Sequence, residues 1–320
     1  MLPQFAAGYT RRLAAFLGRT HRSPRIAFAG DYLVGPYTEA ALTDFEPALV
    51  AELDRVLVPL KRMLSPVAVG LEHIPREGAV LLAGNHTVYG LLDIPMMAFE
   101  IYEATGRVVR GLADHIHFAL PVWRDFLQRI GAVRGTRENC SRLLEAGEPV
   151  LVFPGGGREV MKHKGEKYKL VWKERVGFAR LAIQHGVPIV PFASVGVEDM
   201  FEIVLDAEDL LNSPLGSLLR ALRITEQPWF RHGEIIPPVT RGTGPAGIPR
   251  IERQYFLFGE PIDPSPWAGL HEDREACYAL RTRVKTAVEG GIEALQEVRE
   301  ADPERYPVQR LLRRIASRLR

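Results

Sequence analysis

The chain of 320 residues has only two cysteines, Cys140 and Cys277, and neither belongs to a C-x-x-C spacing. Two isolated cysteines argue against a disulfide framework or a zinc site, and they favour a reducing compartment. No uninterrupted apolar run reaches about 18 residues, so the sequence predicts no membrane-spanning helix. The first 30 residues lack the apolar core of a secretory signal, and we expect none.

Acidic residues are missing from both ends of the chain. Residues 1–30 and residues 308–320 each carry five arginines and no Asp or Glu, although the net charge of the whole chain is only +2. Basic ends on an acidic body predict contact with an anionic surface, either nucleic acid or phospholipid. Residues 4–18 have the pattern of a basic amphipathic helix, which could lie in a membrane interface or pack on its own domain. No nucleic-acid motif is present, so we favour phospholipid.

Lysine is also scarce, since the chain has seven lysines against 34 arginines. Five of them are clustered between residues 162 and 173: Lys162, Lys164, Lys167, Lys169 and Lys173. This cluster predicts a mobile basic loop that docks a polyanion, such as the phosphates of coenzyme A, an acyl carrier protein or lipid headgroups. The alternative is a solvated loop that binds nothing.

A histidine follows the apolar run Ala79–Ala83, which is typical of a short buried strand. His86 therefore lies at the end of a strand, a common position for exposed chemistry. Asp93, seven residues later, could orient the imidazole and stabilise its protonated form. In a continuous helix the two would lie about 10 Å apart along the axis. The pair therefore requires the chain to fold back, which Gly90 permits. The alternative is a histidine that caps a helix and a solvated aspartate.

A second apolar run, residues 149–153, leads into Pro154-Gly155-Gly156-Gly157-Arg158-Glu159. The three glycines allow the backbone to approach a ligand closely, with N–H groups facing a phosphate or an oxyanion. The run is neither a Walker A loop nor G-x-G-x-x-G, so it does not predict nucleotide binding. Arg158 could anchor a polar substrate group. Arg134 and Arg137, in a polar turn after another apolar run, could bind an anionic headgroup or phosphate, or simply cap a helix.

Taken together, these pieces resemble the four sequence blocks of the glycerolipid acyltransferases. The blocks are Gly84-Asn85-His86 with Asp93, Gly131 to Glu138, Pro154 to Glu159, and Val187 to Pro191. The resemblance covers about residues 65–265 and is closest to the diacylglycerol-acyltransferase-like branch, which includes plastid phytyl ester synthases. That branch also has a Pro-Gly-Gly-x-Arg-Glu block with downstream residues like Tyr168, Trp172 and Arg175-x-Gly177-Phe178-Ala179.

The resemblance implies a glycerol-3-phosphate/lysophosphatidate acyltransferase-like fold, with a central mixed sheet flanked by helices. The alternation of apolar runs and amphipathic segments is consistent with such an α/β architecture. We expect a helical segment with amphipathic helices at residues 1–64, including a long helix over 38–64. The α/β domain would span 65–265, with a second helical stretch over 198–223. A C-terminal helical segment with a basic tail would occupy 266–320.

The resemblance further implies O-acyl transfer without a metal. His86, oriented by Asp93, would take the proton of an acceptor hydroxyl, and backbone N–H groups or Arg158 would offset the oxyanion formed on an acyl thioester. No permanently bound cofactor is expected, because the donor is a substrate, either acyl-CoA or acyl-acyl carrier protein. The implied substrate contacts are Asn85, Arg134, Arg137, Gly155, Gly156, Gly157, Arg158 and Glu159. The implied donor contacts are Lys162, Lys164 and Lys167.

Two departures from the phospholipid branch favour a neutral acceptor, such as a diacylglycerol or a fatty alcohol. That branch spaces its His and Asp five residues apart, and it has Pro-Glu-Gly-Thr-Arg where this chain has Gly155-Gly156-Gly157-Arg158. The alternatives are a lysophosphatidate-type acyltransferase, a thioester or ester hydrolase, and a noncatalytic lipid-binding protein. A lipid product without a spanning helix implies peripheral binding to the cytoplasmic face of a membrane. The sequence does not predict the oligomeric state.

Overall fold

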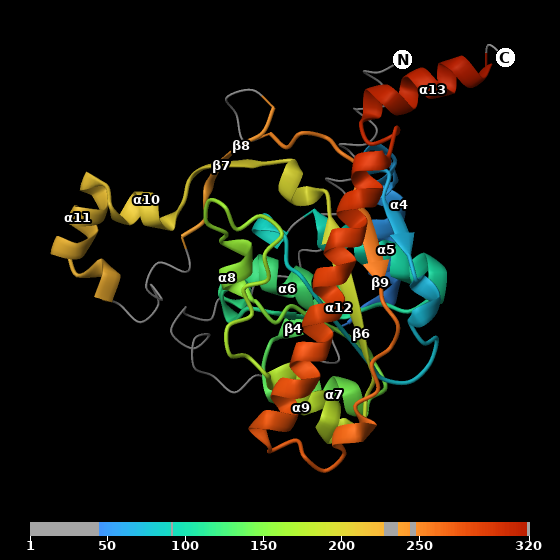
Figure 1. Cartoon of the computed structure of the whole chain (residues 1–320), viewed down its shortest axis with the longest axis vertical. Helices are drawn as coiled ribbons and strands as arrows, with labels where there is room; N and C mark the ends of the chain where they lie inside the picture. Colours follow the sequence, from blue (N-terminus) through green and yellow to red (C-terminus); the bar gives the residue numbers. More distant parts are fainter. Residues whose placement is uncertain (1–44, 91, 227–235, 244–247, 319–320) are drawn as a thin grey trace.

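The computed structural model describes residues 45–90, 92–226, 236–243 and 248–318. The amphipathic helix predicted at 4–18 and the start of the helix predicted at 38–64 lie outside these residues. Within them, helices cover both faces of a central sheet (Figure 1). None of the described helices is long and apolar enough to cross a membrane.

The central sheet has seven strands in the order β1-β9-β6-β2-β5-β3-β4. Their bounds are β1 (Val67–Val69), β2 (Val80–Gly84), β3 (Arg110–Ala113), β4 (Val133–Arg134), β5 (Pro149–Val152), β6 (Ile189–Val195) and β9 (Tyr255–Phe258). Every neighbouring pair is parallel except β6 and β9, which are antiparallel. Strands β2, β5 and β6 are buried throughout, as strands covered on both faces should be. The predicted mixed α/β sheet is confirmed.

Strand β2 occupies the centre of the sheet, between β5 and β6, with Leu82 paired to Leu151 and Val190. Successive side chains point to opposite faces of a strand, so Leu81 and Leu82 belong to two different apolar clusters. Because β2 and β5 run parallel, their carboxyl ends meet at the same edge of the sheet. The segments that follow them, His86 and the glycine-rich turn, are therefore neighbours.

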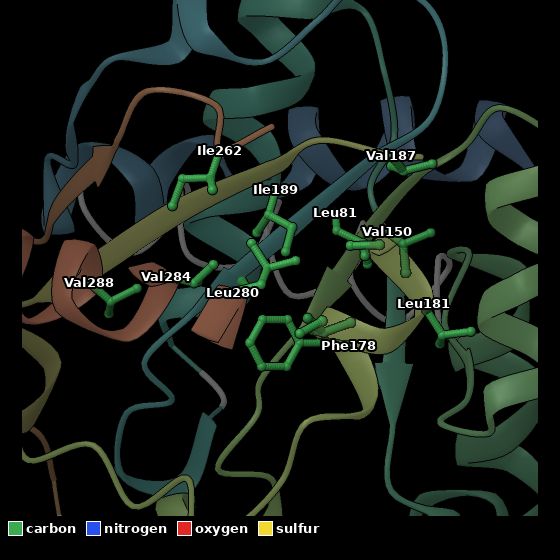
Figure 2. Close-up of a cluster of buried hydrophobic side chains, with 14 of the residues drawn as sticks. Leu81, Val150, Phe178, Leu181, Val187, Ile189, Ile262, Leu280, Val284 and Val288 are labelled. Atoms are coloured by element: carbon green, nitrogen blue, oxygen red, sulfur yellow. The ribbon is translucent and has the colours of Figure 1, made fainter. Parts of the chain in front are cut away.

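Each face of the sheet is covered by its own set of helices. One face carries α4 (Pro47–Leu64) and α5 (Asp93–Thr105), and the other carries α7 (Arg137–Glu145), α9 (Gly177–His185) and α12 (Arg274–Ala301). Leu280, Val284 and Val288 form a buried stripe on α12 and pack with Ile189 of β6 (Figure 2). The C-terminal segment predicted from residue 266 therefore contributes directly to the core of the sheet.

The helical interpretation of residues 198–223 is wrong at its start. Residues Glu202–Leu205 form β7, which pairs antiparallel with β8 (Val239–Arg241). The partner strand lies more than 30 residues away in sequence, so no local pattern reveals the pairing. Helices α10 (Ala207–Leu211) and α11 (Pro214–Ala221) then project from the body (Figure 1). The remaining α-helices of the described residues are α6 (Pro121–Arg129), α8 (Gly157–Val160) and α13 (Pro307–Arg318).

Candidate active site

The end of β2 is fixed tightly against β6. A Cβ on Gly84 would lie 2.3 Å from the carbonyl oxygen of Phe192, so only glycine fits there. The side-chain amide of Asn85 donates to the carbonyl of Ser194 at 2.9 Å and accepts the N–H of Ser194 at 2.8 Å. Asn85 is only 1% exposed. This corrects the expectation that Asn85 contacts the substrate, because its side chain joins two strands and is closed off from solvent.

His86 presents its imidazole at this edge of the sheet. The ring stacks on Phe153, which follows β5, with ring centroids 3.8 Å apart and an interplanar angle of 12°. Gly90 lies against the ring, since a Cβ there would be 2.2 Å from the Cε1 atom of His86. The Nδ1 atom is buried and has no hydrogen-bond partner among the described residues. The ring is thus held by packing, and Nδ1 is left available to a partner.

The described residues between His86 and Asp93 leave helical geometry. Tyr89 and Gly90 both adopt left-handed backbone conformations, with φ of 63° and 58°, so no continuous helix joins His86 to Asp93. Asp93 begins α5 and is 2% exposed. Its Oδ1 also lacks a hydrogen-bond partner within the described part of the chain. No hydrogen bond joins the two side chains in this conformation, so the pairing remains a prediction.

Burial shifts the pKa values of both groups. It lowers the pKa of His86 to about 3, and the nearby positive charges of Lys162 and protonated His117 act in the same direction. Burial raises the pKa of Asp93, while Thr87 and the backbone of Ile94 act in the opposite sense. A neutral imidazole is the form that can accept a proton. The resting site therefore holds a neutral histidine, and the carboxyl group of Asp93, seven residues later, is buried.

Glu159 links three segments of the site. Its Oε2 atom accepts the backbone N–H of His86 at 3.3 Å, and its Oε1 atom accepts the N–H of Val171 at 3.2 Å. A Cβ on Gly155 would lie 2.1 Å from Oε2, so the carboxylate occupies the space that glycine leaves. The side chain is fully buried. This corrects the expectation that Glu159 contacts the substrate: it holds the main chain of His86 in place.

The environment of Glu159 also shifts its protonation. Burial raises the pKa of Glu159 to about 7, and the neighbouring Glu198 adds to this shift. Lys162 and the two accepted backbone N–H groups lower the pKa but do not cancel the effect of burial. The group that positions His86 therefore titrates near neutral pH.

The glycine turn is braced by an arginine that sequence reasoning did not assign to the site. The Nη1 atom of Arg175 donates to the carbonyl of Pro154 at 3.1 Å and to that of Gly155. A Cβ on Gly156 would lie 2.8 Å from the same Nη1 atom. The N–H of Gly156 donates to the carbonyl of Phe153 at 2.9 Å, so it is not offered to an oxyanion. The motif Arg175-x-Gly177 was the available signal, but it gave no hint of this role.

Acidic side chains of the same chain pair with three of the five clustered lysines. Lys162 is 2% exposed, and its Nζ atom lies 3.1 Å from Glu198 Oε1 and donates to the carbonyl of Lys169. Lys164 pairs with Asp209 at 2.7 Å, and Lys167 pairs with Asp199. The three lysines do line one cavity of about 420 Å³, which Val88 also borders. Lys162, however, is unavailable to an anionic donor.

The predicted arginines occupy the same edge of the sheet. Arg158 donates from Nη2 to Glu166 Oε1 at 2.6 Å and from Nη1 to the carbonyl of Met161 at 3.2 Å. Arg134 ends β4, and Arg137 is exposed at the start of α7, which is capped by Thr136. Strand β4 runs parallel to β3, β5 and β2, so its carboxyl end lies at the same edge of the sheet as that of β2. Arg134 and Arg137 therefore lie at the edge that carries His86. Their predicted substrate contacts stay predictions.

The site is thus a histidine at the carboxyl edge of a mostly parallel sheet, supported by a glycine turn and two buried carboxyl groups. No cluster of three or more potential metal ligands occurs in the described residues. Part of the chain is similar to proteins of known class. Residues 66–195 match the family model described as Acyltransferase.

Named relatives agree with that match. The chain is 33% identical over 317 residues to phytyl ester synthase 1, chloroplastic, of Arabidopsis thaliana, covering 92% of this chain and 43% of that protein. It is 36% identical over 134 residues to the DGAT1/2-independent enzyme synthesizing storage lipids of Bos taurus, covering 41% of this chain and 39% of that one. The chain spans less than half the length of these curated relatives.

Among solved structures, the 1-acyl-sn-glycerophosphate acyltransferase PlsC of Thermotoga maritima matches with a TM-score of 0.43 and 16% identity, covering 83% of this chain and 86% of that one. That similarity is too low to bear on function. Residues 66–195 thus form an acyltransferase-family domain, and most of the chain is similar to the phytyl ester synthases. The predicted resemblance is confirmed.

Proposed function

We propose that the protein is an O-acyltransferase that moves a fatty acyl group from a thioester donor to a lipid hydroxyl. One observation carries this proposal. A neutral, half-buried imidazole with a buried, unpartnered Nδ1 and a buried carboxyl group with an unpartnered Oδ1 flank the helix break at Tyr89 and Gly90, in a domain of the acyltransferase family. Such a pair supplies a base that gains stabilisation when it becomes protonated.

In the proposed reaction, the Nε2 atom of His86 takes the proton of the acceptor hydroxyl. The oxygen attacks the thioester carbonyl, the carbon–sulfur bond breaks, and the proton passes from His86 to the departing thiolate. Asp93 stabilises the imidazolium, an interaction that burial strengthens because few waters screen it. We assign the oxyanion contact to backbone N–H groups at this edge, since the guanidinium of Arg158 is already paired with Glu166.

An acyl-cysteine intermediate has no support in the chain. Cys140 and Cys277 are both buried, and burial raises the pKa of the Cys140 thiol to about 12 and also raises that of Cys277. Because the thiolate is the nucleophilic form of cysteine, neither residue is activated for attack. Direct transfer from donor to acceptor is therefore the mechanism we propose.

A neutral acceptor, such as a diacylglycerol or a long-chain alcohol, fits the charges around His86 better than a phosphorylated one. Glu159 lies against the main chain of His86, and two cations of the glycine turn and its loop, Arg158 and Lys162, are paired with Glu166 and Glu198. A phosphate group placed there would compete with these carboxylates for the two cations and would face a buried carboxyl group. The names of the relatives also refer to esters and storage lipids.

The proposal includes the setting of the reaction. The donor is acyl-CoA or acyl-acyl carrier protein, and the acceptor lies in a phospholipid membrane to which the protein binds peripherally on the cytoplasmic side. Two buried free thiols are compatible with a reducing compartment. The basic residues 308–320 would contact anionic headgroups.

The decisive experiment is a product assay with a labelled long-chain acyl-CoA or acyl-acyl carrier protein and four acceptor conditions: diacylglycerol, a fatty alcohol, lysophosphatidate and none. We expect a neutral ester that is absent with His86→Ala and present with the matched control His271→Ala, whose ring is partly exposed. Phosphatidate as the sole product would instead indicate the phospholipid branch. Free fatty acid alone would indicate a hydrolase, and no product with either donor would indicate a lipid-binding protein.

A further inference from the structure

The last helix of the described chain exposes a continuous apolar stripe. Helix α13 follows a break at Asp302-Pro303 and leads away from the body (Figure 1). Val308, Leu311, Leu312 and Ile315 are 66%, 58%, 60% and 48% exposed. Their spacing of i, i+3, i+4 and i+7 places all four on one side of the helix. This is an unusual amount of apolar surface for one short helix to present to water.

The opposite side of α13 is fixed to the body. Arg310 is 7% exposed, and it donates from Nη2 to the carbonyl of Met63 at 2.5 Å and from Nη1 to the carbonyls of Glu304 and Arg305. At 3.6 residues per turn, Arg310 lies about 150° around the helix from the centre of the stripe. Because the side that carries Arg310 faces the last turn of α4, the apolar stripe faces away from the protein.

The turn before α13 is also rigidly attached to the sheet. Arg253 pairs with Asp302 at 2.9 Å and with Glu304 at 3.1 Å, and the hydroxyl of Tyr255 in β9 donates to Asp302 at 2.7 Å. The orientation of α13 is therefore set relative to the same sheet that carries His86.

The charges of α13 are of one sign. No Asp or Glu follows Glu304 in the sequence, and Arg313 and Arg314 are exposed, about 150° and 110° around the helix from the centre of the stripe. Neither arginine pairs with an acidic side chain in the part of the chain that the structure describes, whereas Arg253, Arg299 and Arg305 are all paired with carboxylates. Two copies of α13 packed stripe to stripe would bring unneutralised arginines together.

We propose that α13 lies in the interface of an anionic phospholipid membrane, with the stripe among the acyl chains and the arginines at the phosphates. Helix α13 is attached to the body on the side of Arg310, and it presents an apolar face and unpaired cations outward. A membrane interface stabilises this arrangement. The inference deepens the proposed function, because it names the element that brings the site to its lipid acceptor. Vesicle binding nevertheless tests it without any turnover.

The test is co-sedimentation of the purified full chain with phosphatidylcholine vesicles that contain or lack phosphatidylglycerol. We compare the double variants Leu311→Gln/Leu312→Gln and Arg313→Gln/Arg314→Gln. A matched control, Leu215→Gln/Leu218→Gln, changes two leucines of α11 that are 50% and 53% exposed. We expect each α13 variant to weaken partitioning into anionic vesicles by about tenfold or more, and the control to leave it unchanged. The arginine effect should shrink as salt rises, because screening weakens exposed charges.

Unchanged partitioning of both α13 variants, or an equal loss in the α11 control, would overturn the inference. So would a lower melting temperature or a smaller oligomer for the leucine variant, because either result means that protein covers the stripe. Activity on acceptor dispersed in detergent separates the two proposals. The leucine variant should retain its activity on the dispersed acceptor, and His86→Ala should bind vesicles but form no ester. If neither the wild-type chain nor any variant forms ester, but vesicle binding still depends on the residues of α13, the proposed reaction is refuted and the membrane-binding role of α13 is supported.

Discussion

The Oε2 atom of Glu159 accepts the backbone N–H of His86 at 3.3 Å, across 73 residues of sequence. The other oxygen accepts the N–H of Val171, and the carboxyl group rests in the space left by Gly155. The position of the proposed base is therefore set through the main chain by a residue that does not touch its imidazole. The block that contains His86 and the block from Pro154 to Glu159 are separate in the sequence, but this hydrogen bond joins them in the structure.

This relationship predicts a graded effect of substitutions at Glu159. Glutamine keeps one acceptor but presents an NH₂ group to one of the two backbone N–H donors, which leaves that donor buried and unpaired. We expect Glu159→Gln to cost about 1–3 kcal/mol of unfolding free energy and to lower kcat, and Glu159→Ala to cost more. Urea unfolding and kinetics measure both. Glu138→Gln, at an exposed position, is the control, and equal effects at both sites would contradict the assignment.

The pKa of His86 makes stability depend on pH in a direction that can be worked out. In the folded chain that pKa is lowered to about 3, whereas the unfolded side chain titrates near 6.5. Between these values the unfolded state binds the extra proton, so the contribution of a neutral His86 is present above about pH 6.5 and is lost as pH falls toward 3.

Wild type should therefore lose stability relative to His86→Ala by at most about 1.4 kcal/mol per pH unit between pH 6 and pH 4. The pKa of Glu159, raised to about 7, acts in the opposite sense and is common to both proteins. Urea unfolding of the two proteins at several pH values measures the difference. A difference that is independent of pH would mean that His86 is not desolvated in the folded state.

Two adjacent glycines of α12 give a paired prediction about the core. A Cβ on Gly290 would meet nothing within 4 Å, whereas one on Gly291 would lie 3.0 Å from the Cβ of Ala193 in β6. Alanine is the better helix former, so Gly290→Ala should raise the unfolding free energy by about 0.5–1 kcal/mol. Gly291→Ala should lower it by about 1–3 kcal/mol, because α12 must retreat from the sheet. Thermal unfolding of the pair checks the order, and the reverse order would refute the packing of α12 on β6.

Sequence patterns predicted the parts of the fold that are locally encoded. Strands β2, β5 and β6 are short buried apolar runs, and their order along the chain places His86 beside the glycine turn. The break in helical geometry at Gly90 was predictable, because glycine readily adopts a positive φ. These features depend on residues close together in the chain.

The errors share one cause, which is that the deciding partner lies far away in sequence. Lys162 and Lys167 looked like a free basic cluster, yet Glu198 and Asp199, more than 30 residues later, neutralise them. Asn85 and Glu159 belong to the family blocks, but a block does not distinguish a residue that touches substrate from one that holds the backbone. Arg175 was likewise invisible as a brace for the glycine turn.

The sharpest remaining prediction concerns Asp93. Asparagine has nearly the same shape and cannot carry the charge that would stabilise a protonated His86, so Asp93→Asn should lower kcat by about 10²–10⁴-fold with little change in KM. Because burial already raises the pKa of this carboxyl group, replacing it with a neutral amide should leave the unfolding free energy nearly unchanged. Single-turnover rates and urea unfolding measure the two effects separately.

A double variant decides whether Asp93 acts through His86 or independently of it. If Asp93 serves only to stabilise the protonated imidazole, His86→Ala has already removed what it stabilises, and adding Asp93→Asn should slow the reaction no further. If the two losses multiply, Asp93 has another role, such as fixing the first turn of α5. The unpartnered Nδ1 of His86 and Oδ1 of Asp93 favour the first outcome, because each buried atom lacks the hydrogen bond that the other could supply once the acceptor is bound.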